Sequence, residues 1–334
     1  MKAVVLVGGF GTRLRPLTLT TPKQMLPVVD RPMIERVVGS LARHGVTDAV
    51  LSLGYRPDAF MDAYPDGTCA GVALHYAVEP EPLDTAGAVR YAAVHADLDE
   101  TFLVVNGDVL TDLDVAALWA FHRDRGAEGT IALTRVDDPS RYGVVPVDDT
   151  GRVLEFVEKP SPGAAPTHWI NAGTYVLEPK VLERIDAGRR VSIEREIFPA
   201  MVADGTLYAQ QSDAYWVDAG TPGTYAEAQL DLVDGHRGLS ERAVHADTDI
   251  ADTAVVDHSV VMAGCRIGEY SVVRDSILLP GARLDPRVLV DGSVIGPDAR
   301  IGEGAVLSGM TVVGAGLHVR AGAHLDGVRL PEEG

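Results

Sequence analysis

The residues best suited to chemistry follow the first apolar segment of the chain. Gly8, Gly9 and Gly11 come directly after it. A strand that opens into glycines lets backbone N–H groups approach an anion closely. Arg13 then adds a forked cation, and Lys23 adds a compact one. Because several anionic oxygens would be bound at once, the segment predicts a binding site for a nucleoside triphosphate.

The spacing of these glycines does not fit the two common phosphate-binding motifs. A dinucleotide fingerprint needs a third glycine at the position of Leu14. A P-loop closes on Gly-Lys-Ser or Gly-Lys-Thr, which this segment lacks. The phosphate loop is therefore of another kind.

Two carboxylates are candidates for holding a divalent cation. Asp108 ends a Val-Val-Asn-Gly-Asp run, and a carboxylate at a strand end beside a phosphate loop suits Mg²⁺. Asp218 lies in a Trp-Val-Asp-Ala-Gly-Thr-Pro run, just before a helical pattern. A turn residue at Asp108 and a helix cap at Asp218 are the alternatives.

A sheet must position these groups, because residues 1–235 alternate short apolar strands with helical patterns. We expect strands at 2–8, 48–54, 73–78, 102–106, 129–136, 152–158, 170–177 and 207–212, and helices at 32–44, 84–95, 112–125, 192–204 and 222–233. Asp84, Thr85 and Asp112 are the expected N-caps. The alternation predicts an α/β fold with a doubly wound, mostly parallel sheet, whose ligands bind beyond the carboxyl ends of the strands.

The pattern changes after a polar, glycine-containing segment at 231–245. Aliphatic residues then recur every six positions: Ile295, Ile301, Leu307, Val313, Val319 and Leu325. Each hexapeptide would form one flat side of a triangular coil, with its aliphatic residue pointing inward. The repeat resembles those of left-handed parallel β-helices, and ordinary strand–turn repetition is the alternative. We therefore predict two domains, at 1–234 and 235–334.

The composition limits the partners of this chain. Hydrophobic residues make up 46% of its 334 residues, enough for a large core. Its net charge of −19 argues against nucleic acid and anionic membranes as partners. An anionic substrate then needs local cations, and the four lysines of the chain include Lys23 and Lys159. Short apolar runs and two cysteines that fit no disulfide or metal pattern indicate a cytoplasmic protein.

The whole run from Gly8 to Pro27 resembles the signature of the sugar-1-phosphate nucleotidyltransferases. It reads Gly-Gly-x-Gly-Thr-Arg-Leu-x-Pro-Leu-Thr, followed by Pro-Lys and Leu-Pro. The resemblance implies that Arg13, Lys23 and Asp108 act in catalysis. It implies that Asp108 and Asp218 together hold Mg²⁺. It further implies nucleotide-binding roles for Gly8, Gly9, Gly11, Thr12, Glu79 and Thr85.

Three later fragments occur in the order that the family shows. They are Tyr-Gly-Val at 142–144, Glu-Lys-Pro at 158–160 and Asn-Ala-Gly at 171–173. The resemblance implies that the sugar 1-phosphate is bound by Gly143, Glu158, Lys159 and Asn171. Carboxylate and amide side chains suit sugar hydroxyls because they accept, or accept and donate, at fixed angles. Taken singly, each fragment could be a surface hairpin.

Glu79 is the candidate for recognition of the base. Guanine presents two adjacent donors, which one carboxylate accepts together. The Glu-x-x-Pro-Leu-x-Thr-Ala run that starts at Glu79 resembles the mannose-1-phosphate guanylyltransferase branch, although Asp84 stands where that branch has glycine. We expect Mg²⁺-dependent transfer of a nucleotidyl group from GTP to mannose 1-phosphate, by a homo-oligomer.

Other functions stay open at this point. A glucose-1-phosphate thymidylyl-, uridylyl- or adenylyltransferase would share most of these motifs. A non-catalytic subunit that binds a nucleotide-sugar is a second alternative, although such relatives lose loop or metal residues that this chain keeps. An acyltransferase that works through the coil is a third, since the coil carries His245, His258, His318 and His324.

Overall fold

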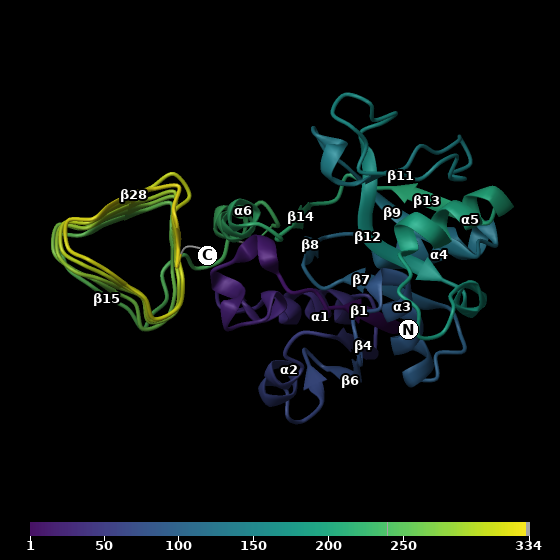
Figure 1. Ribbon diagram of the computed structural model, residues 1–334, viewed down its shortest axis with the longest axis horizontal. Coiled ribbons are helices and arrows are strands. Elements are labelled where there is room, and N and C mark those ends of the chain that lie inside the picture. The colour runs from purple at the N-terminus through teal and green to yellow at the C-terminus, as the bar shows by residue number, and fades with distance from the viewer. Residues whose placement is uncertain (239, 332–334) are drawn as a thin grey trace. The chain divides into compact units, whose positions relative to one another are not determined.

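The computed structural model describes residues 1–238 and 240–331 (Figure 1). They form two compact units. The first comprises Met1–Gly9 and Ile34–Trp216, and the second comprises Phe10–Met33 and the chain from Val217 onward. The segment 10–33 thus leaves the first unit and joins the second. The predicted division at residue 234 follows the sequence pattern and stays a prediction.

The centre of the first unit is a parallel sheet. Its strands β1 (Lys2–Leu6), β4 (Asp48–Leu53), β6 (Val72–Val78) and β7 (Phe102–Asn106) lie in the order β7-β1-β4-β6. Ala3, Val4 and Val5 of β1 are fully buried. This continuous apolar run is what a parallel strand needs when both faces of its sheet are covered.

The other half of the sheet is mostly antiparallel. The strand β12 (Trp169–Leu177) runs antiparallel to β7 and to β9 (Gly129–Arg135). The remaining strands of this half are β13 (Leu207–Gln211), β10 (Gly143–Val144) and β11 (Val157–Glu158). At the opposite edge, β5 (Thr68–Cys69) runs antiparallel to β6. The predicted α/β class is confirmed, with a sheet of mixed direction.

Helices and short strands complete the described chain. The helices are α1 (Met33–Arg43), α2 (Asp58–Ala63), α3 (Asp84–His95), α4 (Val115–Arg125), α5 (Phe198–Asp204) and α6 (Pro222–Asp234). A π-helical turn, Ile193–Ile197, precedes α5, and 3₁₀ turns cover Thr12–Leu14, Leu17–Leu19, Lys23–Met25, Pro139–Arg141 and Pro179–Arg184. Short strands are β2 (Pro27–Val28), β3 (Arg31–Pro32), β8 (Val109–Thr111) and β14 (Trp216–Asp218).

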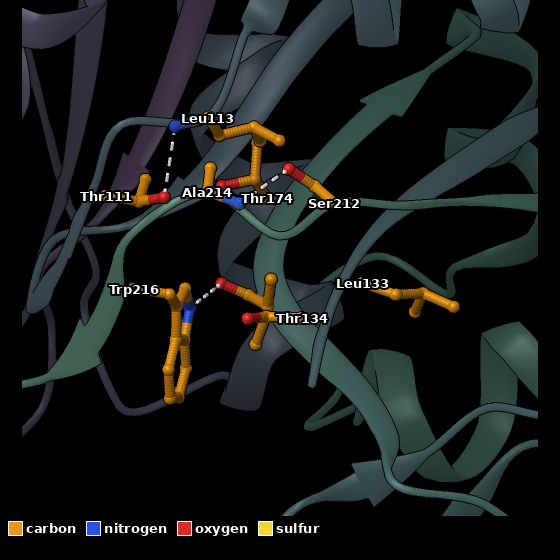
Figure 2. A pocket seen from close by; sticks show the side chains of 9 residues that line it. Thr111, Leu113, Leu133, Thr134, Thr174, Ser212, Ala214 and Trp216 are labelled. Atoms are coloured by element: carbon orange, nitrogen blue, oxygen red, sulfur yellow. Dashed lines mark hydrogen bonds between the residues drawn. The ribbon is translucent and has the colours of Figure 1, made fainter. Parts of the chain in front are cut away.

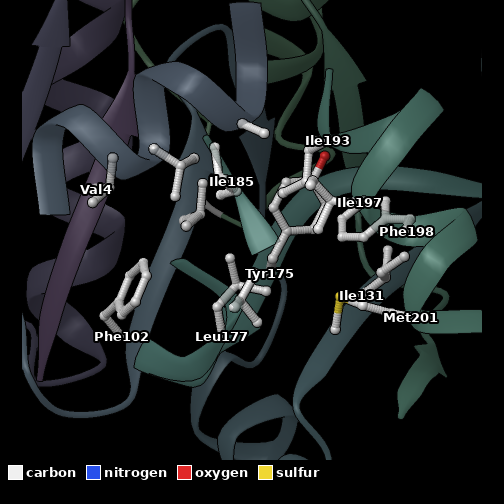
Figure 3. Packing of buried hydrophobic residues seen from close by; sticks show 14 of the residues in the cluster. Val4, Phe102, Ile131, Tyr175, Leu177, Ile185, Ile193, Ile197, Phe198 and Met201 are labelled. Atoms are coloured by element: carbon white, nitrogen blue, oxygen red, sulfur yellow. The ribbon is translucent and has the colours of Figure 1, made fainter. Parts of the chain in front are cut away.

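Aromatic side chains meet within the mostly aliphatic core of the first unit (Figure 3). Tyr175 of β12 meets Phe198 edge to face, with ring centroids 5.2 Å apart. Phe156 lies 5.3 Å from the same ring. Such tilted aromatic contacts add to the burial of large apolar surface. They hold β12 against the segment that leads into α5.

Three local predictions were wrong. The helix α4 begins at Val115 with Asp114 as its N-cap, because the Asp114 carboxylate accepts from Ala117 N–H at 3.0 Å. The predicted cap, Asp112, instead donates its backbone N–H to Tyr215. At the start of α3 neither Asp84 nor Thr85 is a cap, since the N-cap position is Leu83.

The third wrong prediction is the strand at 152–158, of which only Val157–Glu158 forms a strand. Gly151, with φ of +82°, closes a turn just before this segment. Leu154 then lies 57% exposed. The apolar residues at 152–156 thus do not extend the sheet, because side chains such as Leu154 are not covered by another part of the first unit.

The second unit contains the predicted coil, whose triangular cross-section is visible in Figure 1. Each side is a parallel sheet, and we name the sides the first, second and third faces. The first face consists of β15 (Asp249–Ile250), β18 (Arg266–Ile267), β21 (Arg283–Leu284), β24 (Arg300–Ile301) and β27 (His318–Val319). The second face consists of β16 (Val255–Asp257), β19 (Val272–Arg274), β22 (Leu289–Asp291), β25 (Val306–Ser308) and β28 (His324–Asp326). The third face consists of β17 (Val260–Val261), β20 (Ile277–Leu278), β23 (Val294–Ile295), β26 (Val312–Val313) and β29 (Arg329–Leu330).

The six-residue period of the sequence is the period of the faces. The inward residues Ile295, Ile301 and Leu307 are fully buried, one on each face. Stacked coils join their aliphatic side chains into one continuous core. The predicted C-terminal left-handed β-helix is confirmed.

A charged network ties the antiparallel half of the first unit together. The Arg184 guanidinium binds both oxygens of Glu128, at 2.6 and 2.8 Å, and also Asp204 at 2.7 Å. The Glu128 side chain is only 7% exposed. Arg184 holds the pKa of this carboxyl below its usual value, although burial opposes the shift. The bidentate pair is what allows a carboxylate to be buried at this position.

Arg184→Met should lower the free energy of unfolding by about 3 kcal/mol near pH 7, because it leaves a buried carboxylate unpaired. The folded pKa of Glu128 lies below its unfolded value, so the pair stabilises the fold above the unfolded pKa, about 4.3. This stabilisation is lost as the pH falls through the folded pKa. Urea unfolding at pH 7 and below pH 4 should therefore show the two proteins converging in acid. A constant difference at both pH values would contradict this account of Glu128.

Candidate functional site

The carboxyl ends of the parallel strands gather predicted site residues at one edge of the first unit. Gly8 and Gly9 follow β1, Glu79 follows β6, and Asp108 follows β7. Backbone bonds hold this edge together, including Gly107 N–H to Leu6 at 2.9 Å. In open α/β sheets this is the edge where ligands bind.

Gly8 lies close to the Glu79 side chain and to the backbone of Gly54. A Cβ at this position would lie 3.2 Å from the Glu79 Oε1 atom and 3.5 Å from Gly54 N. A Cβ on Gly54 would in turn lie 3.0 Å from Gly8 O. Gly9 faces open space, with no atom within 4 Å of such a Cβ. The structure thus brings Gly8 and Glu79 together beside an open stretch of backbone.

The Glu79 carboxylate is held in place by two donors. Its Oε1 accepts from the Ser52 hydroxyl at 3.0 Å, and its Oε2 accepts from Leu83 N–H at 3.1 Å. A carboxylate offers about four acceptor positions, so two remain for a ligand. Sequence reasoning missed Ser52 and Gly54, and their only signal was a Ser-Leu-Gly run at the end of a predicted strand.

Asp84 and Thr85 begin α3, and Thr85 connects it to the turn before α5. Asp84 has φ of +61°, in the left-handed region where glycine is favoured and aspartate is tolerated. The backbone at position 84 therefore takes a conformation typical of glycine, although the residue is aspartate. The Thr85 hydroxyl donates to Glu194 at 2.7 Å and accepts from Ile193 N–H at 2.8 Å. These two bonds give the Thr85 side chain a structural role. The nucleotide contact that the sequence predicts for Thr85 stays a prediction.

The structure brings Gly143 and Glu158 together, because β10 and β11 pair them directly. A Cβ on Gly143 would lie 2.5 Å from the Phe156 ring and 3.2 Å from Glu158 Oε2. Lys159 Nζ lies 3.2 Å from Glu158 Oε1. The ammonium is 60% exposed and the carboxylate 20% exposed, so the carboxylate anchors a cation that reaches outward.

Asn171 lies at an irregularity in β12, where the register with β9 shifts. Its amide donates to the Tyr175 hydroxyl at 2.9 Å and accepts from Gly173 N–H at 2.9 Å. Gly173 has φ of +73°, and a Cβ there would lie 2.5 Å from the Asn106 amide. The irregularity thus places Gly173 against Asn106, the last residue of the strand that leads to Asp108. Sequence reasoning also missed Asn106.

A small pocket opens next to this stretch (Figure 2). Its lining residues are Thr111, Leu113, Leu133, Thr134, Ala172, Thr174, Ser212, Ala214 and Trp216. The Trp216 indole N–H donates to Ala172 O at 2.9 Å across one wall. The pocket has room for about one water molecule. It is too small for a hexose, and none of the predicted site residues lines it.

The second unit holds the remaining residues of the signature. Gly11 has φ of +61°, and a Cβ there would lie 3.0 Å from the Thr18 side chain and 3.2 Å from the Lys23 Cβ. The Thr18 hydroxyl donates to Gly11 O at 2.8 Å. Thr12 begins the 3₁₀ turn that carries Arg13. Glycine is needed at this position both for its conformation and for the close approach of Lys23.

Arg13 and Asp218 form a pair within the second unit. Their side chains approach to 3.6 Å, with the guanidinium 61% exposed and the carboxylate 18% exposed. A Cβ on Gly220 would lie 2.6 Å from Arg13 Nη2 and 2.7 Å from Asp218 Oδ1. Gly220 was missed in the sequence, although it lies in the same Trp-Val-Asp-Ala-Gly-Thr-Pro run as Asp218.

The two candidate metal ligands belong to different units, Asp108 to the first and Asp218 to the second. Within the residues that the structure describes, no three His, Cys, Asp or Glu side chains form a metal-binding cluster. Mg²⁺ prefers hard oxygen ligands and keeps several of its waters, so one or two carboxylates suffice. The donor set fits Mg²⁺ in its chemistry, and the assignment stays a prediction.

Across the described ranges 1–238 and 240–331, no helix is long and apolar enough to cross a membrane. Both cysteines are buried, and burial raises the pKa of Cys69 and of Cys265 to about 11. Thiols in this state are poor nucleophiles and poor metal ligands. Neither cysteine belongs to the candidate site.

Comparisons with known proteins agree along most of the chain. The family model of the nucleotidyl transferases matches residues 2–235, and that of the GMPPB C-terminal domain matches 239–331. The chain is similar to a mannose-1-phosphate guanylyltransferase of Mycobacterium tuberculosis, 42% identical over 80% of this chain and 76% of that protein. It is also similar to a mannose-1-phosphate guanyltransferase of Emericella nidulans, 47% identical over 66% of this chain and 61% of that protein, which is less than two thirds of the relative.

A solved structure shows the same fold with a nucleotide ligand. HddC from Yersinia pseudotuberculosis complexed with GMP-PN is 32% identical and superimposes with a TM-score of 0.59. The match covers 68% of this chain and 97% of HddC. Together with the geometry of the strand ends, these findings show that the chain belongs to the nucleotidyl transferase family.

Proposed function

We propose that this chain transfers GMP from GTP to mannose 1-phosphate, forming GDP-mannose and pyrophosphate. The observation that carries the choice of nucleotide is the Glu79 carboxylate, which Ser52 and Leu83 hold beside Gly8 at the ligand-binding edge of the sheet. The names of the relatives support the choice of sugar.

Guanine fits the two acceptor positions that Glu79 has left. N1–H and the N2 amino group of guanine point in the same direction, and one carboxylate accepts both. An amide at this position would present a donor to one of them. The single imide N–H of thymine or uracil would leave part of the carboxylate unpaired, which is costly in a partly buried site.

The reaction needs positioning and charge neutralisation. The attacking oxygen belongs to a sugar phosphate that is already ionised at neutral pH, so no general base is required. Arg13 stabilises charge on the departing pyrophosphate, Lys23 binds the α-phosphate, and Lys159 holds the attacking phosphate in line. The exposure of Arg13 and Lys159 suits these roles, since each cation projects from a more buried carboxylate.

Asp108 and Asp218 would hold Mg²⁺, which when bound neutralises phosphate charge as a Lewis acid. Asp218 also orients Arg13 at 3.6 Å. Its side chain thus limits where the guanidinium can lie, whichever phosphate oxygens Arg13 contacts.

The sugar is recognised at the β10–β11 pair. Glu158 accepts from sugar hydroxyls, and Gly143 makes room for the Phe156 ring and the Glu158 carboxylate, which a Cβ at this position would displace. Asn171 keeps one amide hydrogen beyond its bond to Tyr175.

We also propose a cytoplasmic homo-oligomer. The free cysteines support the cytoplasmic location. Apolar side chains exposed on the coil, Val255 at 48% and Tyr270 at 62%, support the assembly.

Glu79→Gln should lower the preference for GTP over dTTP and UTP by tenfold or more, because one buried mismatch costs about 1–3 kcal/mol. The fold should be kept, since a glutamine can still accept from Leu83 and donate to Ser52. The measurement is pyrophosphate release with mannose 1-phosphate and each of the four triphosphates, reported as kcat/KM. A wild-type preference for dTTP, UTP or ATP would refute the guanylyl assignment. Binding of nucleotide-sugar without any pyrophosphate release would indicate a non-catalytic subunit.

Asp108→Asn and Asp218→Asn should each reduce kcat by about 10²-fold or more, the scale of losing one preorganised charged group. Asp149→Asn, an exposed residue of the same type, is the control and should leave kcat unchanged. A readout besides turnover is the Mg²⁺ concentration that gives half-maximal GTP binding, which should rise in both variants. Wild-type values in both would remove these residues from the metal site.

Gly220→Ala should lower kcat at least tenfold, because the added methyl group overlaps Arg13 and Asp218 and forces the pair apart. Gly223→Ala is a matched control three residues later, where a Cβ meets no atom within 4 Å. Alanine also favours helix there, within α6. Steady-state kinetics and circular dichroism on both variants make the comparison. Equal activity of the two alanine variants would show that the Arg13–Asp218 geometry does not matter for turnover.

A further inference from the structure

One face of the coil is buried on its outside. In a strand, alternate residues point to opposite faces, so each coil strand has inward and outward residues. In the first four strands of the third face, the outward residues are at most 1% exposed: Val260, Ile277, Val294 and Val312. The outward residue of its last strand, Arg329, pairs with Val312 and is exposed. The outward residues of the first face are exposed and mostly basic: Arg266, Arg283, Arg300 and His318. Only a layer of chain over the third face can account for this difference.

That layer comes from the second unit and includes the segment 10–33, which carries the phosphate loop. The helix α6 contacts β17 at one end of the third face. At the other end, a Cβ added to Gly314 would lie 3.2 Å from the Pro16 side chain. Leu14 and Leu17, on either side of Pro16, are at most 1% exposed. The apolar side of the segment 10–33 therefore takes part in the burial of the third face.

Polar contacts fix both ends of the segment. Near its start, the Arg329 guanidinium of β29 donates to Arg13 O at 3.1 Å and to Arg15 O at 3.4 Å. Near its end, Val29 N–H donates to the buried Gln229 side chain of α6 at 3.0 Å. The contacts of Arg329 join residues more than 300 positions apart in the chain.

Arginine suits this contact for a geometric reason. Both bonds come from one nitrogen, Nη1, whose two hydrogens are fixed in the guanidinium plane and so reach the carbonyls of Arg13 and Arg15 together. A cation also interacts favourably with the carbonyl end of a helical turn. The turn in question, Thr12–Leu14, is the one that carries Arg13.

We propose that Arg329 is a positioning residue for the phosphate loop, and that the third face of the coil is the surface on which this loop takes its active conformation. Arg329 holds the backbone on both sides of Leu14, and so directs the Arg13 side chain. The coil then influences nucleotide binding indirectly, by holding the backbone of the phosphate loop. The kinetic part of this inference rests on the proposed function, and the structural part does not.

The test compares three variants in the full-length chain. Arg329→Met removes the donors and keeps most of the side-chain length. Arg329→Lys keeps the charge but loses the planar guanidinium that fixes the direction of the Nη1 hydrogens. Arg283→Met is the matched control, an exposed arginine of the first face. Because Arg329 is exposed, its loss should leave the thermal midpoint within about 2 °C of wild type.

The first readout is hydrogen exchange of a peptide that spans residues 10–19, followed by mass spectrometry. Leu14 and Arg15 donate their N–H groups within the turn, to Gly11 O and Thr12 O. Their exchange should be at least tenfold faster in Arg329→Met, intermediate in Arg329→Lys and unchanged in Arg283→Met. Gly314→Ala, which presses on Pro16 from the apolar side, should also accelerate it. Equal exchange in all of these proteins would overturn the proposal.

The second readout is the kinetics of nucleotidyl transfer. Misplacing Arg13 should lower kcat about tenfold in Arg329→Met, with partial recovery in Arg329→Lys and little change in KM for mannose 1-phosphate. Faster exchange with unchanged kcat would overturn the positioning role. A wild-type protein that transfers no GMP would refute the proposed function, while the exchange measurement would still decide whether the coil holds the loop.

Discussion

The parallel register of β1 with its two neighbours is the constraint on which the first unit depends. Leu6, the last residue of β1, pairs with Ser52 on one side and with Asn106 on the other. Because the three strands end together, the residues that follow them meet at one edge. The glycines after β1 and the carboxylate of Asp108 reach that edge for this reason. A shift of one residue in either pair would reverse the faces of every following side chain.

Close packing of other groups against the backbone then explains several of the glycine positions. Gly8 lies against Gly54 and Glu79, Gly143 against Phe156, and Gly173 against Asn106. At each of these, a Cβ would lie within about 3.2 Å of another group. The absence of side chains brings strand ends, a carboxylate and an amide into a small region. The same requirement for space applies at Gly220 in the second unit.

Two cations of the candidate site follow a common electrostatic rule. In a chain of net charge −19, Arg13 and Lys159 each lie beside a carboxylate. The carboxylates are 18% and 20% exposed, whereas the cations are 61% and 60% exposed. The less exposed partner fixes the position, and the more exposed one faces solvent and its ligands. Such pairs add little stability, and we interpret them as holding cations ready for phosphate groups.

The sequence by itself determined the elements whose signal is local. Apolar periodicity located the strands β1, β4, β6 and β7, and the six-residue repeat located the coil, because burial of one face imposes these periods directly. The ordered motifs identified the family for the same reason, since each is a short run with its own chemistry. The tertiary structure decided what depends on distant partners. Asp114 rather than Asp112 caps α4, because the helix begins at Val115, while the backbone N–H of Asp112 is bound to Tyr215 O. Ser52 orients Glu79, and Arg329 reaches Arg13, through contacts between residues far apart in the chain. No local period encodes such contacts, because they form only when packing brings separate segments together.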